Sequence, residues 1–447
     1  MIDTQGDLTK WPPPEEFDRS MMFYNHQQLY QPFWSLPFGR VEPWWDLDKK
    51  HGMNFQTAFA KSGRPFWYAY LQAQGGEKSF DQLIKTAASK LINEPENRAI
   101  SGQWKPDINA SIAIAASRLC LQFLPSSDLV ISLVRDHLCT CVYVSEQLDA
   151  MSAEYVSEPI LALSAISLMI QSEYDFSWQE ILPLLIDQIK GGYIAEKSYR
   201  GELLARVLLS MAWDECCAKE SSVFESIRPV SLQMFLTKLG GGKVIEEMKK
   251  SKISEADPER LLDGYVFFTH FLSVTYSLKE QDLRDCFARS AAMIIKRGEV
   301  AIDLIIPILL KDDKMSYISV QIKNYSSECE STKDLMLENG KLSLIQDVPY
   351  MTIVTNVGES HEFMSHSVER TSLEDIAIIA KTGLGALVVL NGLTDESYPF
   401  LAKKTEQWKN YLAELSSSWA DMIKYGKQSE PFDASFAIQS WFPTSHD

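Results

Sequence analysis

The spacing of apolar residues changes partway along the chain. Up to about residue 190, apolar side chains recur three and four positions apart, as in Phe80, Leu83, Ile84 and Ala87, which predicts amphipathic helices. A strong helix is expected from residue 199 to 218, and short apolar runs of strand length dominate the sequence from residue 290 onward. We expect strands at 290–295, 302–310, 317–323, 351–357 and 385–391.

These patterns divide the chain into four parts. Residues 1–76 are rich in aromatic residues and proline, and aromatic side chains bury large areas, so packing is expected there rather than disorder. A helical region is expected at 77–190, and a mixed α/β sheet domain at 191–403 with a helical insertion at 223–285. The last part, 404–447, is predicted as a helical tail. The predicted fold class is therefore α+β.

One strand-like run contains an acid, Asp303, among apolar residues. A buried carboxylate is costly unless it is paired or bound to a metal, so this position requires an explanation. The polar turn Lys311–Lys314 predicts an antiparallel hairpin with the next run, Ile318–Asn324. Alternation along that run places Gln321 and Lys323 on one face of the strand. The hairpin would bring Asp303 beside this Gln-x-Lys pair.

The residue types in this constellation suit phosphodiester hydrolysis. Asp303, Gln321 and Glu202, the last on the preceding predicted helix, offer the hard oxygen ligands that Mg²⁺ or Mn²⁺ takes. Such an ion polarises a phosphate and lowers the pKa of a bound water. Lys323 is a point charge that orients the water or stabilises the transition state. We therefore predict a Mg²⁺ or Mn²⁺ cofactor, these three residues as its ligands, and all four as catalytic.

Two other interpretations of the same residues remain open. Asp303 either caps a strand or forms an ion pair with Lys296 or Arg297. Glu202 and Arg206 are four residues apart, which is the spacing of an ion pair on a helix surface.

Charge limits the kinds of partner. The net charge of −17 counts against a broad nucleic-acid-binding surface but leaves room for a local one. Two stretches are locally basic: residues 190–206 hold four basic and two acidic residues, and residues 289–323 hold six basic and four acidic ones. Within them, the candidate substrate-binding residues are Arg200, Arg206, Lys296 and Arg297.

The cysteine count and the hydropathy pattern bear on the compartment. Seven scattered cysteines argue against a secreted disulfide scaffold, and no signal peptide or membrane-length apolar stretch is visible. We expect an intracellular protein, cytoplasmic or nuclear, with no membrane association. His137, Cys139 and Cys141 have the residue types of a zinc site, but no second cluster follows, so burial in the core is favoured.

The order of these motifs resembles the restriction-endonuclease-like PD-(D/E)XK superfamily. Asp303 would be the first acid, Gln321 replaces the second acid, and Lys323 is the lysine, whereas Ile302 stands in place of the proline. The resemblance implies a restriction-endonuclease-like sheet domain and a magnesium-dependent nuclease, acting on DNA rather than RNA. The alternative function is a catalytically inactive, nuclease-derived module or effector that binds protein or DNA.

A narrower resemblance covers roughly residues 60–400. The blocks Arg200–Arg206, Ala301–Pro307 and Ile318–Asn324 are similar to the C-terminal part of fungal Crinkler-like and retrotransposon-hot-spot-like proteins, and Ser62–Trp67 resembles the helical region before it. Those proteins pair a P-loop ATPase with a nuclease-like domain. This sequence contains no Gly-x-x-x-x-Gly-Lys-(Ser/Thr), so the ATPase half is missing, and the ATP-driven switching that the resemblance implies is not expected of this chain alone. A protein partner or an ATPase domain acting in trans stays open.

Overall fold

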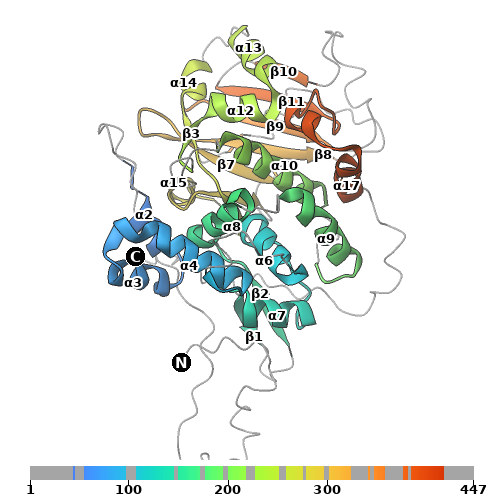
Figure 1. Ribbon diagram of the computed structural model, residues 1–447. Coiled ribbons are helices and arrows are strands. Elements are labelled where there is room, and N and C mark those ends of the chain that lie inside the picture. Colours follow the sequence, from blue (N-terminus) through green and yellow to red (C-terminus); the bar gives the residue numbers. More distant parts are fainter. Residues whose placement is uncertain are drawn as a thin grey trace, which may run out of the picture.

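Helices gather at one end of the molecule and a large sheet occupies the other (Figure 1). The computed structural model describes residues 44–45, 55–96, 107–144, 150–171, 177–194, 200–217, 227–250, 258–274, 278–295, 302–323, 341–342, 347–357, 376–380 and 384–416. Helices and a mixed sheet are both present in these residues, which confirms the predicted α+β class. No helix in these ranges is both long and apolar enough to cross a membrane.

Helices begin before the predicted helical region at 77–190, since α2 (Gln56–Lys61) and α3 (Pro65–Ala73) lie in the segment predicted as aromatic-rich. Asp107 and Ser127 cap two helices of the helical region by accepting hydrogen bonds from the backbone, and Ser177 and Glu180 form a capping box at a third. The helices that follow α3 are η2 (Gly76–Ser79), α4 (Phe80–Ile92), α6 (Ile108–Leu119), α7 (Asp128–Asp136), α8 (Pro159–Gln171) and α9 (Trp178–Lys190).

One stretch of this region was expected to be helical and is not. The apolar run from Leu129 to Val144 splits into α7 and strand β1 (Thr140–Val144), which pairs with β2 (Met151–Glu154) as an antiparallel hairpin. Leu138 has a positive φ of 60°, which ends the helix, and the residues after it alternate in the period of a strand.

The large sheet contains nine strands among the described residues. Its main path runs β10-β11-β9-β8-β7-β4-β3, while β6 also pairs with β7, and β5 pairs with β6. The five expected strands are confirmed as β6, β7, β8, β9 and β11. The bounds are β3 (Val230–Ser231), β4 (Tyr265–Val266), β5 (His270–Val274), β6 (Ala291–Ile295), β7 (Leu304–Leu309), β8 (Met315–Lys323), β9 (Tyr350–Asn356), β10 (Ile376–Ala380) and β11 (Gly385–Asn391).

The hairpin predicted at Lys311–Lys314 is confirmed. Leu310 and Lys314 close the turn by a backbone hydrogen bond of 2.9 Å, and β7 and β8 pair antiparallel along their length. On its other side β8 pairs with β9 in parallel, and β9 pairs with β11 in parallel. The carboxyl ends of β8, β9 and β11 therefore lie at one edge of the sheet.

The predicted helical insertion at 223–285 is part of the sheet domain. It contains helices, as expected, but also β3, β4 and β5, which pair with strands of the main sheet. β4 pairs with the carboxyl end of β7 and β6 with its amino end. The helices of this domain are α10 (Arg200–Cys216), α12 (Leu232–Gly240), α13 (Gly242–Lys250), α14 (Pro258–Leu262), α15 (Glu280–Ala288), η3 (Pro399–Lys403) and, in the predicted tail, α17 (Glu406–Ser416).

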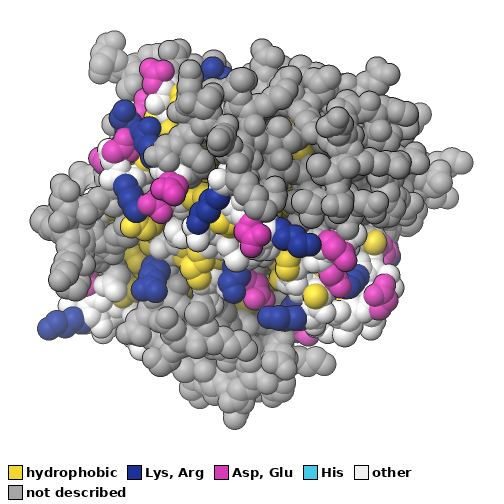
Figure 2. All heavy atoms as spheres, turned by 90° about the horizontal axis from the view of Figure 1, so that it is seen from above, with side chains coloured by type: hydrophobic (Ala, Val, Ile, Leu, Met, Phe, Trp, Pro, Cys, Tyr) yellow, Lys and Arg dark blue, Asp and Glu magenta, His cyan; other side chains and the backbone are white. Residues whose placement is uncertain are grey.

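The surface mixes both signs of charge. Figure 2 shows Lys and Arg side chains interspersed with Asp and Glu over the coloured part of one face. Ion pairs link the ends of strands and helices, as between Arg260 and Asp312 at 2.7 Å and between Arg284 and Asp313 at 3.2 Å. This view therefore shows no broad basic face in the coloured part.

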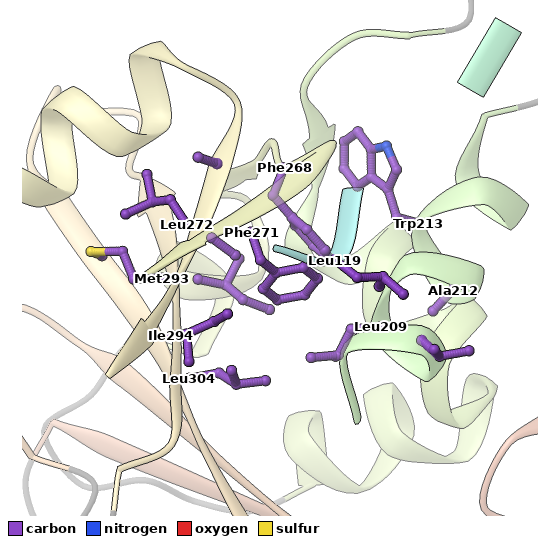
Figure 3. Close-up of a cluster of buried hydrophobic side chains, with 14 of the residues drawn as sticks. Leu119, Leu209, Ala212, Trp213, Phe268, Phe271, Leu272, Met293, Ile294 and Leu304 are labelled. Atoms are coloured by element: carbon purple, nitrogen blue, oxygen red, sulfur yellow. The ribbon is translucent and has the colours of Figure 1, made fainter. Parts of the chain in front are cut away.

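A core of aromatic and aliphatic side chains fixes α10 on the sheet. Leu209 and Trp213 of α10 lie near Phe271 and Leu304, and all four side chains are fully or almost fully buried (Figure 3). Helix α10 therefore covers the face of the sheet to which Leu304 belongs.

The described part of the N-terminal segment packs as predicted. Trp44 contacts the rings of Phe55, Phe59 and Phe287, and its Nε1 donates to the Ala288 carbonyl at 2.7 Å. Trp45 Nε1 donates to Asp313 Oδ1 at 2.9 Å, at the turn of the β7–β8 hairpin. Residues 1–43 lie outside the described ranges.

The block Ser62–Trp67 forms a buried anchor in the helical region. Glu158 has a fully buried side chain and accepts hydrogen bonds from Arg64 Nη2 and from Trp67 Nε1, both at 2.7 Å. A Cβ added at Gly63 would lie 2.9 Å from Glu158 Oε2, so glycine permits this close approach. The block therefore has a structural explanation in the described residues.

Candidate functional site

The carboxylate of Asp303 lies against the Gln-x-Lys segment of β8. Asp303 Oδ2 accepts a hydrogen bond of 2.6 Å from the backbone N–H of Ile322, the residue between Gln321 and Lys323. The Asp303 carbonyl continues the β6–β7 ladder by accepting from Ile295 at 2.9 Å, and its N–H donates to the Val320 carbonyl of β8 at 3.0 Å. The structure thus brings together the acid of one hairpin arm and the motif of the other.

The regular register of the β7–β8 hairpin ends at the pair of Leu304 and Val320. Asp303 lies just before this pair, and its N–H donates to the Val320 carbonyl, one residue off the register of the ladder. Gln321 is buried, at 1% exposure, whereas Asp303 is partly exposed. The backbone of Lys323 is two residues further along β8, and its side chain lies outside what the structure describes.

Glu202 belongs to helix α10, which covers the face of the sheet opposite to that of Gln321. It lies half-buried in the first turn of α10, and α10 contacts β8. Because α10 covers the face of Leu304 and Val320, and Gln321 alternates to the opposite face, Glu202 would join Asp303 only across the end of the sheet. The structure therefore brings Asp303 to the Gln321–Lys323 segment through the Ile322 N–H and leaves Glu202 on a neighbouring element.

Arg206 has a structural role. Its guanidinium is buried, at 2% exposure, and Nη1 donates to the carbonyls of Leu119 and Cys120, the latter at 3.2 Å. These carbonyls end helix α6, where Cys120 has a left-handed φ of 52°. A cation at a helix C-terminus stabilises it, and a guanidinium directed at these carbonyls is committed to the helix end rather than to a substrate phosphate. Arg206 is therefore withdrawn from the substrate-binding set.

The side chains of the other candidate substrate-binding residues lie outside what the structure describes. Lys296 and Arg297 lie outside the described residues, and so does the alternative ion pair of Asp303 with either of them. Arg200 is described only as the first residue of α10, without its side chain.

The donor set suits a hard cation with few protein ligands. Within the described ranges, no three His, Cys, Asp or Glu side chains cluster as a metal site. Asp303 and Gln321 offer a carboxylate and an amide, whose oxygens are hard ligands. Magnesium commonly binds one or two carboxylates and fills its other positions with water and phosphate, so these residues fit it.

The zinc interpretation of His137, Cys139 and Cys141 finds no support in the described residues. His137 Nδ1 shares a hydrogen bond of 3.0 Å with the Leu91 carbonyl. Burial raises the pKa of the Cys139 thiol well above its ordinary value, and the charge of Glu154 adds to the shift.

A buried polar network joins the helical region to the sheet. His270 begins β5, and its Nε2 shares a hydrogen bond of 2.8 Å with Ser157 Oγ, while Nδ1 lies 3.1 Å from Thr269 Oγ1. Burial lowers the pKa of His270 to about 3, and the charges of Arg289 and Arg118 add to this shift. His270 is therefore neutral in the folded protein at physiological pH.

We expect His270 to make the protein sensitive to acid. In the unfolded chain its pKa is near 6.5, so below that pH the unfolded state binds a proton that the folded state excludes until about pH 3. The free energy of unfolding should fall by roughly 2 kcal/mol between pH 7 and pH 5 from this group alone. Urea denaturation of the wild type and of His270→Gln at both pH values measures the difference. Equal pH dependence in the two proteins would refute this role.

The sequence belongs to a family of unknown function. The family model described as "Domain of unknown function (DUF8736)" matches residues 103–347, which is 245 of the 447 residues, and the chain therefore belongs to this family. The match includes α10, β7 and β8, and it ends before β9 and β11. Neither the search of curated proteins nor the search of solved structures found a match.

Proposed function

We propose that this member of the DUF8736 family is a metal-dependent nuclease of the PD-(D/E)XK type, with DNA as its preferred substrate. The observation that carries the proposal is the 2.6 Å hydrogen bond between Asp303 Oδ2 and the Ile322 N–H, because it holds the acid at the Gln321–Lys323 segment. The order of elements also supports it: a helix with Glu202 is followed in the sequence by a hairpin in which Asp303 of one arm contacts the Gln321–Lys323 segment of the other.

Each residue has a stated role in this proposal. A bound Mg²⁺ or Mn²⁺ would polarise the scissile phosphate and acidify a coordinated water. Asp303 and Gln321 would hold this ion with their oxygens, and Glu202 would reach it only across the end of the sheet, directly or through a water. The ammonium of Lys323 would orient the attacking water or neutralise charge that develops on the phosphate.

A second candidate function is a nuclease-derived module that binds protein or DNA without cleaving it. Two observations favour it: Gln321 stands where an acid is usual in the motif, and the net charge is −17. A single carboxylate beside an amide binds a divalent ion more weakly than two carboxylates do.

Cleavage by the purified full chain separates the two functions. We expect cleavage of double-stranded or single-stranded DNA with Mg²⁺ or Mn²⁺, slower cleavage of RNA, and none with EDTA. Mn²⁺ should also raise the melting temperature, since a ligand at 100 times its Kd stabilises a folded protein by about 2.7 kcal/mol. A protein that cleaves no DNA or RNA with either metal, and that Mn²⁺ does not stabilise, would be the non-catalytic module.

A further inference from the structure

Three parallel strands end in polar residues at one edge of the sheet. β8 ends in Lys323, β9 in Asn356 and β11 in Asn391, and the register pairs Lys323 with Asn356 and Asn356 with Asn391. Each of these residues follows a largely apolar strand. Ligands of open α/β sheets bind at the carboxyl ends of parallel strands, so this row lies where a ligand is expected.

The row is adjacent to the Asp303 site. Gln321 pairs with Val354 and lies two residues before Lys323 on β8. Its position is therefore on the same face of the sheet as the row. Neighbouring strands are about 4.8 Å apart, so Asn391 lies roughly 10 Å from β8. A distance of roughly 10 Å is the length of about three nucleotides of one DNA strand at about 3.4 Å each.

The side chain of Asn391 presents an unsatisfied acceptor. Its Oδ1 is buried and has no hydrogen-bond partner among the described residues. The backbone around it is fixed: the Asn391 carbonyl accepts from Ser397 Oγ at 2.5 Å, and Gly392 N donates to the Asn356 carbonyl at 2.8 Å. A buried amide oxygen without a donor is costly, and a ligand that supplies the donor explains why it is there.

We infer that Asn391 accepts a hydrogen bond from the nucleic acid bound at Asp303, an inference that rests on the proposed function. An amide oxygen only accepts, and phosphate oxygens also only accept at neutral pH, so the group that it binds is not a phosphate. The substrate offers two kinds of donor: a base N–H, such as the exocyclic amine of adenine, and the ribose 2′-hydroxyl of RNA. Asn391 therefore positions the strand that Asp303 cleaves.

Equilibrium binding in EDTA tests this without cleavage. The probes are fluorescent DNA and RNA oligonucleotides of one sequence, and DNA of the same length without bases. We expect Asn391→Leu to weaken binding of base-containing DNA about tenfold if the donor is on the base, and of RNA alone if the donor is the 2′-hydroxyl. Binding of abasic DNA should stay unchanged. Asn109→Leu, in α6, is the control because Asn109 Nδ2 already donates to Ser132 Oγ, and it should bind like the wild type.

The outcomes separate this inference from the proposed function. Asn391→Leu should melt at or above the wild-type temperature, because the leucine removes an unsatisfied polar atom. Unchanged binding of both DNA and RNA, or equal weakening toward abasic DNA, would overturn the inference and leave the nuclease proposal standing. A lowered melting temperature together with weaker binding would make Asn391 a structural residue. A wild type that neither binds nor cleaves nucleic acid would overturn both.

Discussion

The Asp303→Asn variant is expected to lose magnesium-dependent cleavage by roughly 10³-fold while keeping its fold. The asparagine oxygen still accepts the hydrogen bond that Ile322 N donates to Asp303 Oδ2 at 2.6 Å, so the end of the β7–β8 ladder remains closed. The negative charge that would hold the cation is gone. Single-turnover cleavage and thermal melting on the same preparations measure both effects.

Two further variants make this test specific. Asp303→Ala removes the hydrogen bond as well as the charge, so it should be destabilised by about 1.5–3 kcal/mol relative to Asp303→Asn. Asp312→Asn changes an acid at the opposite end of the same hairpin, paired with Arg260, and should cleave like the wild type. If Asp303→Asn keeps its activity, Asp303 is a strand cap and no more.

The Arg118→Ala variant is expected to lose about 3–5 kcal/mol of unfolding free energy, the largest stability effect that the structure predicts. The guanidinium of Arg118 is almost fully buried and makes a two-pronged contact with Asp214, at 2.7 and 2.8 Å. Asp214 Oδ2 also accepts from Trp178 Nε1 at 2.9 Å, and Arg118 Nε donates to the Thr269 carbonyl at 3.3 Å. Removing the cation leaves a largely buried carboxylate without its charge partner.

Urea denaturation gives the measurement, and Arg135→Ala gives the matched control. Arg135 pairs with Asp136 at 2.7 Å, but its side chain is 50% exposed, and exposed pairs contribute about 0–1 kcal/mol. A loss below about 1 kcal/mol in Arg118→Ala would show that the pair does not hold α6, α9, α10 and the start of β5 together.

The strands and the hairpin were predictable because their signals are local. The runs that became β7, β8, β9 and β11 are buried and rich in β-branched residues, and Lys311–Lys314 is a polar turn between two of them. Alternation then placed Gln321 and Lys323 on one face of the strand, and the hairpin brought Asp303 to the segment that contains them.

The errors arose where tertiary pairing decides local structure. β3 and β4 contain two residues each, too short for any periodicity, and they are strands only because β4 pairs with β7 and β3 pairs with β4. β5 contains His270 and lies in a run of aromatic residues, which gives no alternation, and its pairing with β6 makes it a strand. Because of these strand pairings, the segment that was predicted as a helical insertion is part of the sheet.

Two features of the site were also beyond sequence patterns. The spacing of Glu202 and Arg206 indicates a surface ion pair, but the carbonyls that Arg206 binds lie 86 and 87 residues away in sequence. The row that ends in Asn391 depends on the parallel register of β9 and β11, which no local pattern specifies. In the sequence, the only sign of this row was a polar residue at the end of each apolar run.

Anomalous diffraction from a crystal soaked in Mn²⁺ tests the central claim most directly, namely that Asp303 and the Gln321–Lys323 segment form one cation site. We predict a manganese peak about 2.1 Å from a carboxylate oxygen of Asp303, with the amide oxygen of Gln321 beside it and the Glu202 carboxylate reaching the same ion or one of its waters. A soaked crystal with no peak at Asp303, or with manganese bound only elsewhere, would contradict it.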